Sequence, residues 1–163
     1  MFTIDSHRKM SDGKIIQGCP HTSLLLNHKN RNKIIMKAVS DLRNYDFDTI
    51  VCCGTSGLLV APQISEILDK HIVVIRKPSE KRYSDFDIEG VTPYRYIIVD
   101  DLVCSGWTVK LIKNTLYEES PRSLCVGAYF YLPEECAYSG HSGSILFKRD
   151  FGIPALNLLP QRT

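Results

Sequence analysis

Short apolar runs alternate with segments of helical spacing along most of this chain, and no other feature of the sequence constrains its fold as strongly. The apolar runs, predicted to be strands, cover residues 48–53, 71–75, 96–99 and 123–131, and we expect the first two to be buried. The segments with helical spacing cover residues 31–42, 58–68 and 108–117. Strands that alternate with helices in this way build a mostly parallel sheet with helices on both faces. The pattern therefore predicts an α/β fold.

The length and charge of the chain limit the kinds of protein it can be. It has 163 residues, 23% of them charged, and a net charge of +2. This length suits one domain spanning residues 1–163, and the near-neutral charge argues against a general nucleic-acid binder. No apolar run approaches the ~20 residues that span a bilayer, and the polar start lacks the apolar core of a secretory signal. We expect a cytoplasmic protein with no nucleic-acid or membrane partner.

The six cysteines do not form a disulfide or zinc pattern. Cys52, Cys53 and Cys125 lie inside apolar runs, which is typical of buried free thiols in a reducing compartment. Cys19 and His21 are the only close Cys/His pair, and no C-x-x-C motif occurs. We therefore expect no metal held by protein ligands alone.

Three unusual segments follow three successive predicted strands. In chain order they are the expected tight loop Gly54-Thr55-Ser56-Gly57, the basic pair Arg76-Lys77, and the acidic pair Asp100-Asp101. Ligands of an open parallel sheet bind beyond the carboxyl ends of its strands, where these segments would meet. The sequence therefore predicts one site at this edge of the sheet.

The acidic pair leads into a short loop that opens the next predicted helix. The loop consists of Cys104, Ser105, Gly106, Trp107 and Thr108. Backbone N–H groups at a helix start suit a phosphate, and the serine and threonine hydroxyls can add donors. The two carboxylates would repel a phosphate, but they can accept hydrogen bonds from the hydroxyls of an attached sugar. This combination predicts a sugar-phosphate site.

Residues 96–108, YIIVDDLVCSGWT, resemble the phosphoribosyl-pyrophosphate motif of the type I phosphoribosyltransferases. Residues 57–62 and 73–78 are similar to the pyrophosphate loop, helix and next strand of the adenine-type members. The resemblance covers residues 34–130, roughly, and implies the type I phosphoribosyltransferase fold with a small hood. The core would span about residues 31–132, and the hood would come from residues 1–30, residues 133–163, or both.

The resemblance also implies a role for each motif. Asp100 and Asp101 would hold the ribose 2′- and 3′-hydroxyls, and residues 104–108 would wrap the 5′-phosphate. Thr55 and Ser56, with neighbouring backbone, would contact pyrophosphate.

Charge on the leaving pyrophosphate would be taken up by Arg76, Lys77 and Mg²⁺, the last bridging pyrophosphate and ribose oxygens largely through water. Residues 81–90, which include Lys81 and Arg82, would form a flexible loop that closes over the reacting centre.

The implied activity is transfer of 5-phosphoribose from phosphoribosyl pyrophosphate to a nitrogen of a nucleobase or similar heterocycle, with release of pyrophosphate. We expect a pentosyltransferase that forms a homodimer. The alternative is a regulator or sensor that binds phosphoribosyl pyrophosphate with little turnover.

Several residues depart from the subclasses of the family. Thr55 and Ser56 stand where adenine-type members usually carry an acid and an arginine. Cys104, a nucleophile or an inert loop thiol, stands where hypoxanthine/guanine-type members place an aspartate. The orotate-type subclass is not excluded, because its members carry an uncharged residue at the position of Cys104 and have a lysine-rich loop. Trp107, in a slot more often Gly or Lys, could stack on a ring or simply pack.

Each motif has a simpler explanation when it is taken alone. Paired acids often cap a strand end or a helix, Gly-Thr-Ser-Gly is most often only a turn, and a charged run such as residues 76–82 is usually a solvated surface. The order of the motifs favours the site, because three segments at three consecutive strand ends fit one ligand.

Overall fold

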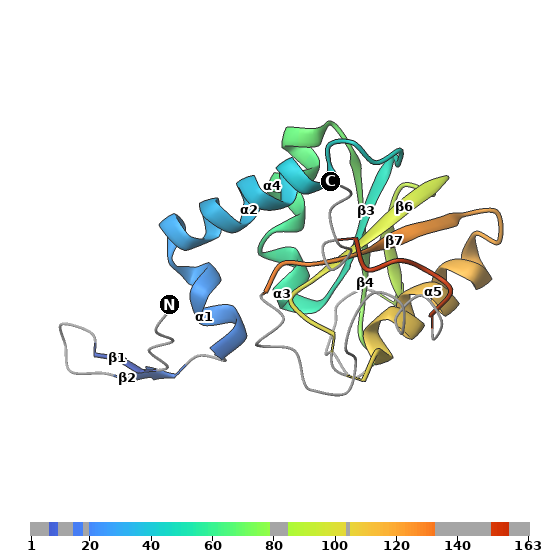
Figure 1. The fold of residues 1–163 in the computed structure, drawn as a ribbon. Helices are drawn as coiled ribbons and strands as arrows, with labels where there is room; N and C mark the ends of the chain where they lie inside the picture. Colours follow the sequence, from blue (N-terminus) through green and yellow to red (C-terminus); the bar gives the residue numbers. More distant parts are fainter. Residues whose placement is uncertain are drawn as a thin grey trace.

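A five-stranded sheet forms the centre of the computed structural model (Figure 1). In spatial order its strands are β5 (Ile88–Gly90), β4 (His71–Ile75), β3 (Thr49–Cys53), β6 (Arg95–Asp100) and β7 (Leu124–Phe130). All neighbours are parallel except β5, which runs antiparallel to β4. The structure describes residues 7–9, 15–17, 20–78, 85–103, 105–132 and 151–156. The mostly parallel α/β fold predicted from the sequence is confirmed.

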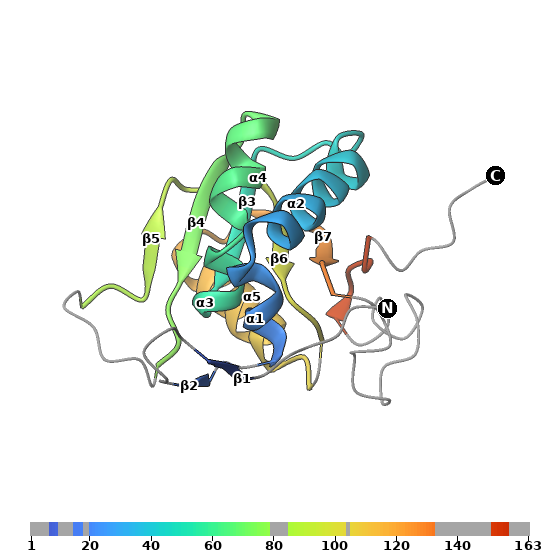
Figure 2. The same cartoon turned by 90° about the vertical axis from the view of Figure 1, so that its left-hand side faces the viewer.

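Helices cover both faces of the sheet (Figures 1 and 2). One face carries α1 (Pro20–Leu26), α2 (His28–Leu42) and α4 (Ala61–Leu68), and the other carries α5 (Trp107–Glu119). The central strand β3 is buried along its whole length because it serves both cores. Ile50 and Cys52 face the α2 side, whereas Val51 and Cys53 face the α5 side, as the two-residue period of a strand requires.

The predicted helices and strands are all present, with shifts at their ends. The helix expected over residues 58–68 begins at Ala61, and Pro62 lies in its first turn, where a missing N–H costs least. The expectation of a buried second strand was wrong in part, since only Val73 and Ile75 of β4 are buried. Its outer neighbour β5 has only three residues, so β4 is shielded less than the central strands.

Residues 54–57 are not a loop, as the sequence suggested, but most of the one-turn helix α3 (Gly54–Leu58). Gly54 has a φ of 71°, a left-handed conformation that favours glycine and turns the chain directly after β3. Gly57 packs against β3, and a Cβ there would lie 2.7 Å from Cβ of Cys52. The two glycines thus shape a tight helical turn that lies directly on the sheet.

The flexible loop predicted over residues 81–90 is wrong at its end. Its last residues form β5, where Glu89 pairs with Val74 and Gly90 with Val73. Gly90 is therefore a strand residue rather than part of a flexible loop, and a Cβ there would lie 2.5 Å from the carbonyl oxygen of Ile72. Lys81 and Arg82, predicted for that loop, lie outside the described residues.

The two ends of the chain contain elements that the sequence did not predict. Near the start, β1 (His7–Lys9) and β2 (Ile15–Gln17) form an antiparallel pair, and α1 follows. Near the other end, Ala155 lies parallel to Ala128 of β7, and the Ala128 N–H donates to the carbonyl oxygen of Pro154. Which end forms a hood stays a prediction, because most of residues 1–19 and 133–163 lie outside the description.

The predicted burial of the cysteines is confirmed for two of the three that the structure describes. Cys52 and Cys53 are buried, Cys125 is half-buried, and all three are free thiols. Burial raises the pKa of the Cys52 thiol to about 12, so it is inert as a nucleophile. Within the described part of the chain, no helix combines the length and apolar character needed to cross a membrane.

Candidate active site

The acidic pair lies where β6 ends, and a hydrogen bond joins it to the segment that follows β3. Asp100 is only 6% exposed and Asp101 is half-buried. Oδ1 of Asp100 accepts hydrogen bonds from the Ser56 hydroxyl at 3.0 Å and from the Asp101 N–H at 2.9 Å. Ser56 belongs to α3, which follows β3. Two of the three predicted segments are therefore in direct contact.

The surroundings of Asp100 disfavour its charged form. Burial is the largest cause and the negative charge of Asp101 the second, and together they raise the pKa of this carboxyl to about 7. The hydrogen bonds from the Asp101 N–H and the Ser56 hydroxyl oppose the shift without cancelling it. Hydrogen-bond donors or a cation brought by a ligand would favour the carboxylate again.

The end of β7 supports the acidic pair, which the sequence did not predict. Tyr131 donates its hydroxyl to the carbonyl oxygen of Ser56 at 3.0 Å, and its N–H donates to the carbonyl oxygen of Asp100 at 3.1 Å. The Leu132 N–H donates to the carbonyl oxygen of Asp101 at 3.0 Å. In the sequence Tyr131 resembles any core tyrosine at a strand end, so no signal distinguished it.

The loop between the acids and α5 packs against Phe151. Gly106 has a φ of 74°, and a Cβ there would lie 2.0 Å from Cζ of Phe151, so only glycine fits. The Ser105 hydroxyl accepts a hydrogen bond from the Trp107 N–H at 3.3 Å. Trp107, the first residue of α5, is 49% exposed and Thr108 is half-buried. The helix α5 thus begins at Trp107, a short loop after the acidic pair, while Cys104 lies outside the described residues.

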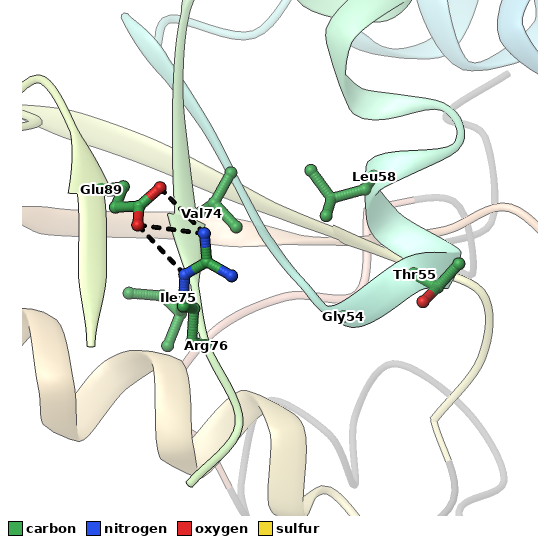
Figure 3. A pocket seen from close by; sticks show the side chains of 7 residues that line it. All are labelled: Gly54, Thr55, Leu58, Val74, Ile75, Arg76 and Glu89. Carbon is green, nitrogen blue, oxygen red and sulfur yellow. Dashed lines mark hydrogen bonds and ion pairs between the residues drawn. The ribbon is translucent and has the colours of Figure 1, made fainter. Parts of the chain in front are cut away.

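A pocket of about 480 Å³ lies between α3 and the end of β4 (Figure 3). Its lining consists of Gly54, Thr55, Leu58, Val74, Ile75, Arg76 and Glu89. The pocket brings Gly54 and Thr55 of the Gly-rich turn together with Arg76 of the basic pair, whereas Lys77 does not line it.

Arg76 forms a two-pronged ion pair with Glu89 of β5 (Figure 3). Its Nε and Nη2 donate to Oε1 of Glu89 at 3.1 and 3.0 Å, and Nη2 also donates to Oε2 at 3.1 Å. The positive charge of Arg76, which was predicted to stabilise pyrophosphate, is therefore balanced by Glu89. In the described part of the chain no ion pair involves the neighbouring Lys77. Glu89 was missed because its contact with Arg76 depends on the pairing of β4 with β5.

Comparison with models of known protein families identifies the family of this chain. Residues 21–136 match the model of the phosphoribosyl transferase domain. The chain belongs to the phosphoribosyltransferase family. The predicted resemblance and the predicted class of enzyme, a transferase of the glycosyltransferase type, are confirmed at the level of this family.

Individual relatives within the family differ in what they are named for. The chain is 25% identical over 130 residues to an adenine phosphoribosyltransferase of Petrotoga mobilis, an alignment covering 68% of this chain and 75% of that protein. It is 31% identical over 108 residues to the transcriptional regulator GfcR of Methanocaldococcus jannaschii, covering 60% and 51%. The chain thus spans about half the length of that regulator.

Solved structures agree on the fold. The orotate phosphoribosyltransferase of Aeropyrum pernix superimposes with a TM-score of 0.62, covering 91% of this chain and 82% of that one at 17% identity. This likeness confirms the type I phosphoribosyltransferase fold predicted from the sequence.

Proposed function

We propose that this phosphoribosyltransferase uses phosphoribosyl pyrophosphate with Mg²⁺ to transfer 5-phosphoribose to a nitrogen of a nucleobase or a similar heterocycle. The observation that carries the proposal is the hydrogen bond between Ser56 and Asp100, because it joins the acidic pair to the turn beside the pocket. A sugar at the acids, a phosphate at α5 and a pyrophosphate at the pocket would then belong to one ligand.

The acidic pair would act on the ribose. Carboxylates of Asp100 and Asp101 would accept hydrogen bonds from the 2′- and 3′-hydroxyls and so orient the sugar. In the reaction a bond forms between the base nitrogen and C1 of ribose, the proton of that nitrogen passes to water or to pyrophosphate, and the bond from C1 to the pyrophosphate oxygen breaks. Positive charge develops at C1 as the bond electrons leave with pyrophosphate, and nearby carboxylates stabilise that charge.

The leaving pyrophosphate would lie toward the pocket. Thr55 is exposed and lines it, so its hydroxyl and the α3 backbone can donate to phosphate oxygens. Lys77 follows Arg76 at the end of β4 and supplies a cation without a partner among the described ion pairs. Arg76 would serve chiefly as a hydrogen-bond donor, because Glu89 already balances its charge.

The donor set of the site fits Mg²⁺ bound mainly through substrate. The described residues contain no group of three or more His, Cys, Asp or Glu side chains suited to a metal. Mg²⁺ on phosphates usually takes one or two carboxylates, several waters and phosphate oxygens, and two adjacent carboxylates meet that need. Asp100 and Asp101 would help to hold the ion largely through water, and the ion when bound would neutralise charge on the pyrophosphate.

Release of pyrophosphate tests the activity and the acceptor together. The full chain would be incubated with phosphoribosyl pyrophosphate, Mg²⁺ and single purine or pyrimidine bases, orotate included. Base-dependent release of pyrophosphate, lost in D100N/D101N, supports the proposal. A folded protein that binds no phosphoribosyl pyrophosphate contradicts it.

A sensor is the second candidate function, favoured by the 31% identity to a transcriptional regulator. It would bind phosphoribosyl pyrophosphate at the same residues but release no pyrophosphate with any base. The homodimer and the cytoplasmic location also stay proposals, and light scattering of purified protein would test the first.

A further inference from the structure

The hydroxyl of Ser56 forms a hydrogen bond with the acidic pair. Its Oγ donates to Oδ1 of Asp100 across 44 residues of sequence, and its carbonyl oxygen accepts from the Tyr131 hydroxyl across 75 residues. Ser56 is therefore bonded through its side chain to the end of β6 and through its backbone to the end of β7.

The two donors on Asp100 fix one oxygen of its carboxylate. The Ser56 hydroxyl and the Asp101 N–H both reach Oδ1, at 3.0 and 2.9 Å. Among the described residues, the Ser56 hydroxyl and Asp101 N–H donors leave Oδ2 to the neighbouring Asp101 carboxyl, which also interacts with this side chain, or to a ligand. A carboxylate held by one oxygen presents the other in a defined direction.

Tyr131 is built to hold Ser56 in place. It is 8% exposed, and it belongs to the core on the side of α2 and α4, so its ring is fixed by packing. Its hydroxyl reaches Ser56, and its backbone N–H donates to the carbonyl oxygen of Asp100 at 3.1 Å. One rigid residue thus contacts both members of the Ser56–Asp100 pair.

We propose that Ser56 and Tyr131 are positioning residues that orient the Asp100 carboxylate toward the ribose hydroxyls, and that Ser56 does not contact pyrophosphate. This inference rests on the proposed function, in which Asp100 binds ribose. It separates two neighbours that the sequence placed together, since Thr55 lines the pocket and keeps the pyrophosphate role (Figure 3).

The test compares two ligands that each occupy one part of the site. Ribose 5-phosphate and inorganic pyrophosphate are titrated separately into the full chain with Mg²⁺ by calorimetry. S56A is expected to weaken the binding of ribose 5-phosphate about 10-fold, as for a lost charge-assisted hydrogen bond. Its affinity for pyrophosphate is expected to stay unchanged. S56T keeps a hydroxyl and is expected to restore the affinity. T55A is the matched control, with the opposite pattern expected.

Removing the tyrosine hydroxyl provides an independent test. Y131F keeps the buried ring and is expected to weaken the binding of ribose 5-phosphate about threefold, the size of one neutral hydrogen bond. Its affinity for pyrophosphate is expected to stay unchanged. Melting curves of every variant show that folded protein is titrated, and Y131F carries the same contrast should S56A not fold.

Two results overturn the inference. One is a folded S56A with lower affinity for pyrophosphate and unchanged affinity for ribose 5-phosphate. The other is a Y131F that binds both ligands as tightly as the wild type. A folded wild type that binds neither ligand would overturn the proposed function itself, so the two failures are distinguishable.

Discussion

Replacing Asp100 by asparagine tests the electrostatics of the unliganded site. Burial and the charge of Asp101 raise the pKa of Asp100 from 3.8 to about 7. Between these values the folded state keeps a proton that the unfolded chain has lost. Such a group stabilises the fold at low pH, and its contribution disappears as the pH rises through the folded pKa. The unfolding free energy of the wild type should therefore fall between pH 5 and pH 7.

The size of this effect follows from the two pKa values. One proton changes the unfolding free energy by about 1.4 kcal/mol per pH unit, so the interval from pH 5 to pH 7 corresponds to about 2–3 kcal/mol. Asparagine does not titrate, and its Oδ1 can keep the hydrogen bonds from Ser56 and the Asp101 N–H. The stability of D100N relative to wild type should rise by that amount, or about 5–10 °C in melting temperature.

Denaturant unfolding in EDTA at pH 5, 6, 7 and 8 measures the difference without metal. E66Q, which removes an exposed carboxylate on α4, is the matched control for the loss of one negative charge. A D100N difference that stays constant from pH 5 to pH 8 would refute the reasoning, because Asp100 would then titrate near its ordinary pKa.

Two further substitutions test the packing and the charge around the pocket. Gly57→Ala should destabilise the protein by about 1–3 kcal/mol, because a Cβ there would lie 2.7 Å from Cβ of Cys52. Melting measures this, and wild-type stability would contradict the packing of α3 on β3. Glu89→Gln should change stability by less than ~1 kcal/mol, since Arg76 and Glu89 are 32% and 42% exposed. It should tighten inorganic pyrophosphate binding at low salt, because the Arg76 charge is no longer balanced, and weaker binding by calorimetry would contradict this.

The sequence predicts the central strands and the meeting of two of the three motifs well, for a physical reason. β3 and β6 are buried on both faces, so their residues form apolar runs that no surface segment would carry. Because parallel strands end at one edge, their polar successors had to meet there. The hydrogen bond from Ser56 to Asp100 shows that meeting.

What the sequence did not predict depends on contacts between distant residues. The glycines of α3 favour a turn when taken alone. The helical turn depends on the packing of Gly57 against Cys52, which no local pattern shows. β5 is three residues long, too short for a periodic signal, and Glu89 meets Arg76 only through its pairing. Tyr131 and Ser56 are 75 residues apart, and no local pattern connects them.

The measurement that tests the central claim most directly is the affinity for phosphoribosyl pyrophosphate with Mg²⁺ of the wild type and of D100N/D101N. If the acidic pair holds the ribose, the double variant should stay folded and bind about 100-fold more weakly or worse, because two hydrogen bonds to charged groups, each worth about 1.5–3 kcal/mol, are weakened. At 100 times its dissociation constant the ligand should stabilise the wild type by about 2.7 kcal/mol. A folded double variant that binds as tightly as the wild type would contradict the account, since the acids would then only cap the strand.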